Sequence, residues 1–271
     1  RGQLGPARHS GNSIVVLTFN SSPTIEACLE SVLGTMGPGD ELIVVDNASA
    51  DATLEIVEGF RAADPRVAII ANGANLGFSA GCNVGLRASG GARVLLLNPD
   101  TVVYGGWLET LAEGLADPSV GMVGPLSDNV AGDQFVAAHL NLKGRSGLSP
   151  QGLAQECREE LAGRSVSTKL LIGLCVAMRR ETLDKVGLLD EDLFLGNDDL
   201  EISWRLRTHG FTLLVMLDAF VHHECGVSFA SLPKGTTSRM TRESTERLRE
   251  KVRAAYGWSP TSTELWGADI R

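Results

Sequence analysis

Short apolar runs alternate with longer amphipathic stretches through the N-terminal part of the chain. The apolar runs are rich in valine, isoleucine and leucine and predict strands at 13–19, 41–46, 67–71 and 93–97. The intervening stretches predict helices at 24–35, 50–63 and 79–89. Strands that alternate with helices in this way form βαβ units. We therefore expect an α/β fold with a Rossmann-like, mostly parallel central sheet and helices on both faces.

The alternation is lost after this region and returns towards the C-terminus. Loops and short helices are expected across 126–165. Beyond them the pattern predicts strands at 169–178, 212–217 and 219–223, and helices at 180–186, 199–208 and 242–256. We expect three parts: a disordered segment over 1–12, one domain over 13–230, and over 231–271 a loop and an amphipathic helix that packs on the domain.

Composition narrows the class of protein and its compartment. Hydrophobic residues make up 43% of the 271 residues and aromatic residues only 5%, so aliphatic side chains must fill one large core. No two of the five cysteines share a CxxC spacing, which favours free thiols in a reducing compartment and predicts a cytoplasmic location. The longest apolar run, 170–178, is far shorter than the roughly 18 residues that a transmembrane helix needs.

The charge of the chain argues against nucleic acid as a partner. The formal net charge is -9, whereas binding to a duplex needs clustered lysine and arginine. The clearest basic cluster, 239–253, is interrupted by Glu243, Glu246 and Glu250, which is typical of a solvated helix face. The alternative is that this face meets an anionic partner, such as a membrane surface in a peripheral association.

Polar segments follow the predicted parallel strands. They span 18–22, 46–49, 72–78 and 98–101 and are rich in asparagine, aspartate, serine and glycine. In open α/β sheets, ligands bind beyond the carboxyl ends of the strands, so we expect a ligand site at this edge. The glycine-rich stretch 75–81 has neither P-loop nor GxGxxG spacing, which argues against an ATPase and a dehydrogenase.

A carboxylate stands at the tip of one predicted central strand. The apolar run 93–97 leads directly into Asn98, Pro99 and Asp100. A carboxylate in this place can hold a divalent cation against a diphosphate. A turn in which Asp100 caps the next helix explains the same residues, and both interpretations stay open.

Acidic residues gather at the start of a predicted helix, at Asp198, Asp199 and Glu201. Capping and the helix macrodipole favour acids there by ~0.3–2 kcal/mol, which explains one or two of them. Phe194 and Gly196 come just before and predict a partly apolar pocket. Desolvation in such a pocket would raise the pKa of a carboxyl group and make it a better general base.

Two adjacent histidines, His222 and His223, end the last predicted strand. Neighbouring side chains on a strand point to opposite faces, so at most one of them faces a given site. A histidine in this place is more often structural than a ligand. If Asp100 and His223 converge, however, one carboxylate, one imidazole and a diphosphate can complete a metal shell.

Taken in order, these motifs resemble the family 2 glycosyltransferases of the GT-A fold, in the inverting, rhamnosyltransferase-like branch. The resemblance covers about 13–230 and rests on the segments 15–20, 43–51, 75–85, 97–100, 198–205 and 223–228. It implies an enzyme of glycan biosynthesis that transfers a sugar from a UDP- or dTDP-linked donor to a hydroxyl of a glycan or polypeptide. It also implies Mn²⁺ or Mg²⁺ as cofactor and inversion in one displacement.

The resemblance assigns roles to residues. Asp199 matches the general base, and Asp100 and His223 match the metal ligands. Asn98 replaces the first acid of the family's DxD motif, so Asp100 alone would give the metal a carboxylate. Asp46 would accept a hydrogen bond from the nucleobase. The residues expected to bind the donor are Thr18, Asn20, Asp46, Asn47, Asn75, Gly77, Asn83, Asn98 and Asp198.

Two other functions fit an α/β sheet with these motifs. A sugar nucleotidyltransferase would need a basic triphosphate-binding loop early in the chain, and the segment 19–24 contains no lysine, arginine or glycine. A non-catalytic sugar-nucleotide-binding or assembly module would keep the region of Asp46 but would not need Asp199 and His223. Both stay open as alternatives to the transferase.

Overall fold

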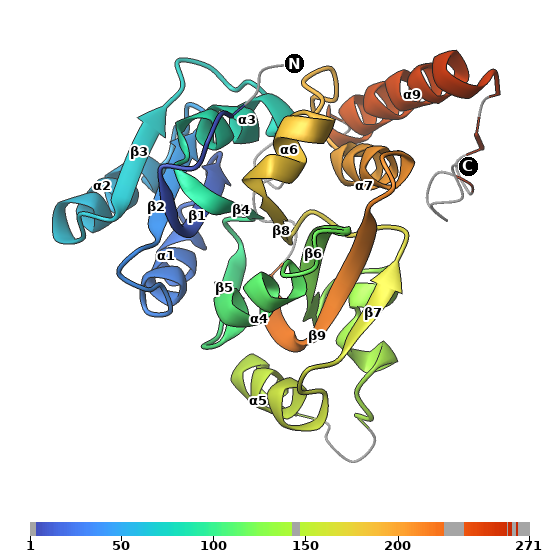
Figure 1. Ribbon diagram of the computed structural model, residues 1–271. Helices are drawn as coiled ribbons and strands as arrows, with labels where there is room; N and C mark the ends of the chain where they lie inside the picture. Colours follow the sequence, from blue (N-terminus) through green and yellow to red (C-terminus); the bar gives the residue numbers. More distant parts are fainter. Residues whose placement is uncertain (1–3, 143–146, 225–235, 259, 262–263, 265–271) are drawn as a thin grey trace.

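The computed structural model describes residues 4–142, 147–224, 236–258, 260, 261 and 264 (Figure 1). The strands are β1 (His9–Thr18), β2 (Glu41–Asp46), β3 (Val67–Ala71), β4 (Gly91–Leu97), β5 (Thr101–Val103), β6 (Val120–Ser127), β7 (Ser165–Thr168), β8 (Cys175–Arg179) and β9 (Thr212–His223). The helices are α1 (Ile25–Leu33), α2 (Thr53–Ala63), α3 (Phe78–Ala88), α4 (Trp107–Gly114), α5 (Pro150–Glu160), α6 (Arg180–Val186), α7 (Asp198–Thr208) and α9 (Thr236–Tyr256). Two 3-10 turns, η1 (Gly132–Gln134) and η2 (Val136–Ala138), lie between β6 and α5.

A single sheet connects all of these strands. Its order is β3-β2-β1-β4-β8-β6-β9-β5, and β7 pairs with β9. Parallel pairing joins β3, β2, β1 and β4, and again β6 and β9, whereas β8 runs antiparallel between β4 and β6. The predicted α/β class with a Rossmann-like parallel core is confirmed.

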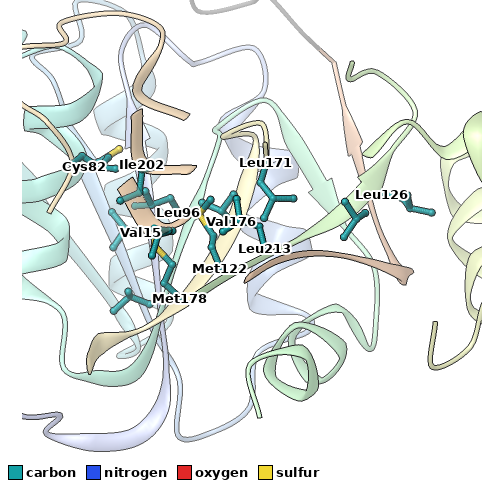
Figure 2. Close-up of a cluster of buried hydrophobic side chains, with 14 of the residues drawn as sticks. Val15, Cys82, Leu96, Met122, Leu126, Leu171, Val176, Met178, Ile202 and Leu213 are labelled. Atoms are coloured by element: carbon teal, nitrogen blue, oxygen red, sulfur yellow. The ribbon is translucent and has the colours of Figure 1, made fainter. Parts of the chain in front are cut away.

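The two-residue period of β1 sends its side chains into two separate cores. Val15 lies in one buried cluster with Cys82 of α3 and Ile202 of α7 (Figure 2). Ile14 lies in the other cluster, on the opposite face, with Ile25 of α1. Because both faces of the sheet are covered, the parallel strands are apolar at nearly every position rather than at alternate ones.

Several predicted boundaries are wrong. The segment 1–12 is not disordered throughout, because β1 begins at His9 and Asn12 is buried within it. The strand predicted over 169–178 is confined to β8, and the two strands predicted at the end of the sheet form one continuous strand, β9. Helix α9 begins at Thr236, ahead of the predicted start at 242.

Strands β5 and β6 and helix α4 lie where the sequence pattern predicts neither a strand nor a helix. The sequence of β6, VGMVGPLS, contains glycines and a proline and is typical of a loop. Pro125 is accommodated because the pairing register of β6 with β9 shifts between Pro125 and Leu126. Strand β5 has only 3 residues, too few to show a period.

Helix α9 packs on the domain through its apolar side. Leu248 and Val252 are fully buried and lie in one cluster with Leu193 and Leu200. Most of the loop predicted before this helix, 225–235, lies outside the described residues. Across the ranges that the structure describes, no helix is both long enough and apolar enough to cross a bilayer.

A buried ion pair within α7 holds a guanidinium group that bonds to the backbone at the end of α6. Arg205 and Glu201, 4% and 2% exposed, meet at 2.7 Å, and the guanidinium also donates to the carbonyl oxygens of Val186, Gly187 and Leu188. Because Arg205→Ala would leave the Glu201 carboxylate buried and unpaired, we expect it to lower the free energy of unfolding by about 3–5 kcal/mol. Urea denaturation measures this loss, and a loss below about 1 kcal/mol, as for a surface pair, would contradict the expectation.

Candidate active site

A cleft of about 300 Å³ opens at the carboxyl edge of the parallel strands. Its walls come from the ends of β1, β2 and β4, the start of α3, the segment before α7, and α9. The lining residues are Leu17, Thr18, Phe19, Asn47, Asn75, Gly77, Phe78, Asn98, Pro99, Asp100, Phe194, Leu195 and Met240. The predicted residues among them are Thr18, Asn47, Asn75, Gly77, Asn98 and Asp100, and the other predicted residues lie around this cleft or away from it.

Asp46 and Asn20 do not line the cleft, but they support the turns that do. The Asp46 side chain is 2% exposed and accepts hydrogen bonds from the Thr18 hydroxyl at 3.0 Å and the Ser49 hydroxyl at 2.5 Å. Asn20 is left-handed, with φ 51°, and its side-chain oxygen accepts from the Ala50 N–H at 2.8 Å. These bonds join the turn after β1 to the turn after β2. Asp46 therefore has a structural part in addition to the predicted contact with a nucleobase.

Gly77 lets two segments meet at the rim of the cleft. Its φ is 82°, and a Cβ at this position would lie 2.6 Å from the carbonyl oxygen of Phe194. The same oxygen accepts a hydrogen bond from the Phe78 N–H at 2.8 Å. Asn47 donates to the Gly77 carbonyl at 3.0 Å, and Asn75 accepts from the Gly77 N–H at 2.9 Å. The two asparagines thus hold the turn that brings the segment before α7 against α3.

Asn83 lies away from the cleft. Its side chain is 1% exposed and makes two hydrogen bonds with the backbone of Leu189, at 2.9 Å and 3.0 Å. It also donates to the Glu191 carboxylate at 2.9 Å. The Asn83 side chain therefore supports the loop before α7 and lies outside the described lining of the cleft.

Asp100 and His223 come together at one end of the cleft. Antiparallel pairing sets Thr101 of β5 opposite His223 of β9, and Asp100 Oδ1 lies 3.3 Å from His223 Nε2. Both side chains are largely buried, 8% and 12% exposed. Burial lowers the pKa of His223, but the hydrogen bond to Asp100 and its charge outweigh this, and the pKa lies above its usual value.

The ligand atoms of this pair suit a divalent cation. His223 Nδ1 lies 3.1 Å from the Asn129 carbonyl oxygen, which suits a proton on Nδ1, and Nε2 is the ring nitrogen that faces the Asp100 carboxylate. A nitrogen and a carboxylate oxygen are ligands that Mn²⁺ accepts. In the part of the chain that the structure describes, no three histidine, cysteine or acidic side chains cluster as metal ligands. A cation here would complete its shell with water or with the oxygens of a bound anion.

His222 points to the other side of β9. Its Nδ1 lies 2.6 Å from Asp128 Oδ2, and Asp128 Oδ1 accepts from the His223 N–H at 3.3 Å. Asp128 follows β6 directly and so fixes the end of β9 that carries both histidines. The sequence alone does not predict the contact of Asp128 with His222, because β6 has no recognisable strand pattern. The one available signal is a carboxylate just after a buried strand, as at Asp100.

Asp198 and Asp199 open helix α7 next to the cleft. Asn197 caps the helix with φ 64°, and the Leu200 N–H donates to Asp199 Oδ1 at 2.8 Å. Both acids are half-buried and line a cavity of about 10 Å³, and Phe78 lines both this cavity and the cleft. Burial raises the pKa of both carboxyl groups, and with the added charge of Asp199 the pKa of Asp198 reaches about 8. A general base that works near neutral pH needs a pKa raised in this way.

Solved structures with a similar fold are glycosyltransferases. The mannosyltransferase PcManGT from Pyrobaculum calidifontis, in complex with GDP-Man and Mn²⁺, aligns with a TM-score of 0.62 at 20% identity, over 98% of this chain and 70% of that chain. S. aureus TarS in complex with UDP-GlcNAc aligns with a TM-score of 0.60 at 17% identity, over 94% of this chain and 75% of that chain. At these identities the likeness defines the fold, which is the predicted GT-A fold.

The sequence family follows from a family model and from relatives in sequence. The family model described as Glycosyl transferase family 2 matches residues 13–187, and the chain belongs to this family. An N-acetylglucosaminyltransferase of Rhizobium meliloti is 28% identical over 222 residues, 77% of this chain and 50% of the relative. An uncharacterized protein of Sinorhizobium fredii is 31% identical over 209 residues, 73% of this chain and 23% of the relative. The chain therefore spans half or less of the length of these relatives.

Proposed function

We propose that this domain transfers a sugar from a nucleoside-diphosphate donor to a hydroxyl group of a glycan or polypeptide, with a divalent cation and with Asp199 as general base. The observation that carries the proposal is one arrangement at the sheet edge. The Asp100–His223 pair stands at one end of the cleft, and the acids of α7 lie beside it across the shared Phe78. Membership of family 2 supports the reaction class. UDP- or dTDP-linked donors follow from the sequence resemblance, and the similar structures hold GDP-Man and UDP-GlcNAc.

The charged side chains that line the cleft indicate that a diphosphate would need a bound cation. Asp100 is the only charged side chain among the described residues that line it. The negative charge of a diphosphate is therefore not offset by any of those side chains. Mn²⁺ or Mg²⁺ held by Asp100 and His223 would supply this charge and stabilise the leaving diphosphate. Asn98 adds no negative charge where the family's motif has an acid, and its amide is free to meet a hydroxyl or phosphate oxygen of the donor.

Asp199 would accept the proton of the acceptor hydroxyl as its oxygen attacks the anomeric carbon. Attack from the side opposite the leaving diphosphate inverts the anomeric centre in one displacement. Such a displacement needs no nucleophile from the enzyme. The raised pKa of Asp199 suits this role, and the neighbouring Asp198 titrates with it as a pair.

A thermal-shift panel tests the proposed class. UDP-GlcNAc, UDP-galactose, dTDP-rhamnose and GDP-Man would each be added with Mn²⁺ and with EDTA. We expect one donor to stabilise the protein in the presence of Mn²⁺ only, by about 2.7 kcal/mol at 100 times its Kd. We also expect the protein to hydrolyse this donor slowly, with water as the acceptor and nucleoside diphosphate as the product. No shift with any donor would contradict the transferase. A shift without any release of nucleoside diphosphate would favour the non-catalytic binding module instead.

The rate is expected to rise with pH as the acid pair ionises. Only the ionised carboxylate can accept a proton. Burial raises the pKa of Asp199 above its ordinary value of 3.8. Burial and the charge of Asp199 together raise the pKa of Asp198 from 3.8 to about 8. The acid limb of kcat is therefore expected above the ordinary range of an aspartate, with about a tenfold fall per pH unit below its midpoint. Asp198→Asn removes the neighbouring carboxyl group and is expected to move the midpoint to lower pH. A profile that is flat from about pH 5 to 9 would contradict a buried carboxylate base.

A further inference from the structure

Helix α9 contributes to the cleft although it lies outside the residues 13–187 that define the family match. Met240 of α9 lines the cleft together with Phe194 and Leu195. Figure 1 shows α9 beside α7, the helix that begins with the two acids. The contacts between the two helices therefore bear directly on the site.

The chain enters α7 through a strained turn. Gly196 and Asn197 are both left-handed, with φ 78° and 64°. Glycine adopts this conformation freely, and asparagine tolerates it better than most other residues, yet it remains unfavourable for asparagine. Asn197 is only 3% exposed, so its conformation is set by neighbouring protein groups and not by water. Asp198 and Asp199 follow directly, so the direction of their side chains depends on this turn.

Side chains of α9 hold the turn from one side. Asn197 Nδ2 donates to the Thr245 hydroxyl at 3.0 Å, and that hydroxyl donates to the Thr241 carbonyl at 2.8 Å. With its proton committed to Thr241, the Thr245 oxygen presents a lone pair to Asn197. The Leu195 N–H also donates to the Ser244 hydroxyl at 3.4 Å. On the other side of the turn, the backbone hydrogen bond from the Phe78 N–H to the Phe194 carbonyl oxygen joins the same segment to α3.

From this geometry we infer that Thr245 is a positioning residue for the general base. Through Asn197 it fixes the left-handed turn and so aims the Asp199 carboxylate at the acceptor oxygen. The inference rests on the proposed function, because it needs Asp199 to be the base. A displacement of about 1 Å at a catalytic group can lower a rate by roughly 100-fold, so a single hydrogen bond at this turn has a measurable effect.

Thr245→Val tests the inference, because it removes the hydroxyl and keeps the shape of the side chain. The assay is Mn²⁺-dependent hydrolysis of whichever of UDP-GlcNAc, UDP-galactose, dTDP-rhamnose or GDP-Man gives the thermal shift, with water as acceptor. We expect kcat to fall about 10- to 100-fold while the donor Kd stays within about twofold. Thr245→Ser restores the hydroxyl and is expected to restore kcat. Ser238→Ala, which removes an exposed hydroxyl from the same helix, is the matched control.

Two outcomes would overturn the inference. One is a kcat for Thr245→Val within twofold of the wild type. The other is a parallel loss of kcat and donor affinity that Thr245→Ser does not rescue, because α9 would then only support the cleft. Thr245→Ala, which adds no methyl group against Asn197, replaces Thr245→Val if that variant does not fold. Asp199→Asn in the same assay tests the base itself, so failure of the positioning role and failure of the proposed function give different results.

Discussion

Asp199→Asn is expected to lower kcat by about 10²–10⁴-fold and to leave the donor Kd within about twofold of the wild-type value. The amide has nearly the size of the carboxylate but cannot accept the proton of the acceptor hydroxyl. Asp199 does not line the cleft, so the contacts to a donor should persist in the variant. Release of nucleoside diphosphate gives kcat, and titration of the donor in the presence of Mn²⁺ gives Kd.

Two further variants test whether Asp199, and not a neighbouring acid, is the general base. Asp192→Asn changes an acid on the loop before α7 whose side chain is 67% exposed, and it is expected to keep kcat within about twofold. Asp198→Asn is expected to change the pH midpoint more than the maximal rate. A larger loss of kcat in Asp198→Asn than in Asp199→Asn would transfer the role of base to Asp198. An equal loss of rate and donor affinity in Asp199→Asn would remove the base assignment altogether.

The parallel half of the fold is predictable from the sequence because its strands are buried on both faces. β1, β2, β3 and β4 read as compact apolar runs, and the polar residues that follow them necessarily meet at one edge. This rule alone brings Asn47, Asn75 and Asp100 to the same cleft. The acids of α7 are also visible in the sequence, since capping explains only part of their number.

The antiparallel half is less predictable because its strands are short, bulged or interrupted by glycine and proline. Without β5 and β6 the sequence cannot show that Asp100 reaches His223, or that Asp128 pairs with His222. Hydrogen-bond partners far along the chain are equally hidden. Asn83 matches the family motif, yet its amide forms hydrogen bonds with a residue 106 positions away. Only the folded structure shows that these hydrogen bonds occupy the polar atoms of the side chain.

Loss of either proposed metal ligand is expected to remove the effect of Mn²⁺ on donor binding. Asp100→Asn takes the only negative charge from the described lining of the cleft, and His223→Gln takes the imidazole that lies 3.3 Å from Asp100. Without a cation, the charge of the diphosphate is not offset by any described lining side chain. We therefore expect each variant to weaken Mn²⁺-dependent donor affinity by at least about 100-fold, as EDTA should in the wild-type protein.

Titration of Mn²⁺ followed by electron paramagnetic resonance, with and without UDP, measures this directly. The wild-type protein is expected to bind Mn²⁺ weakly alone and more tightly with UDP, because two protein ligands leave most of the shell to diphosphate and water. His209→Gln, at an exposed position after α7, is the control and should bind like the wild type. His222→Gln is the sharper comparison, because His222 is adjacent in sequence but turned towards Asp128. If His222→Gln lost Mn²⁺ and His223→Gln kept it, the cation would lie on the other side of β9 and the proposed site would be wrong.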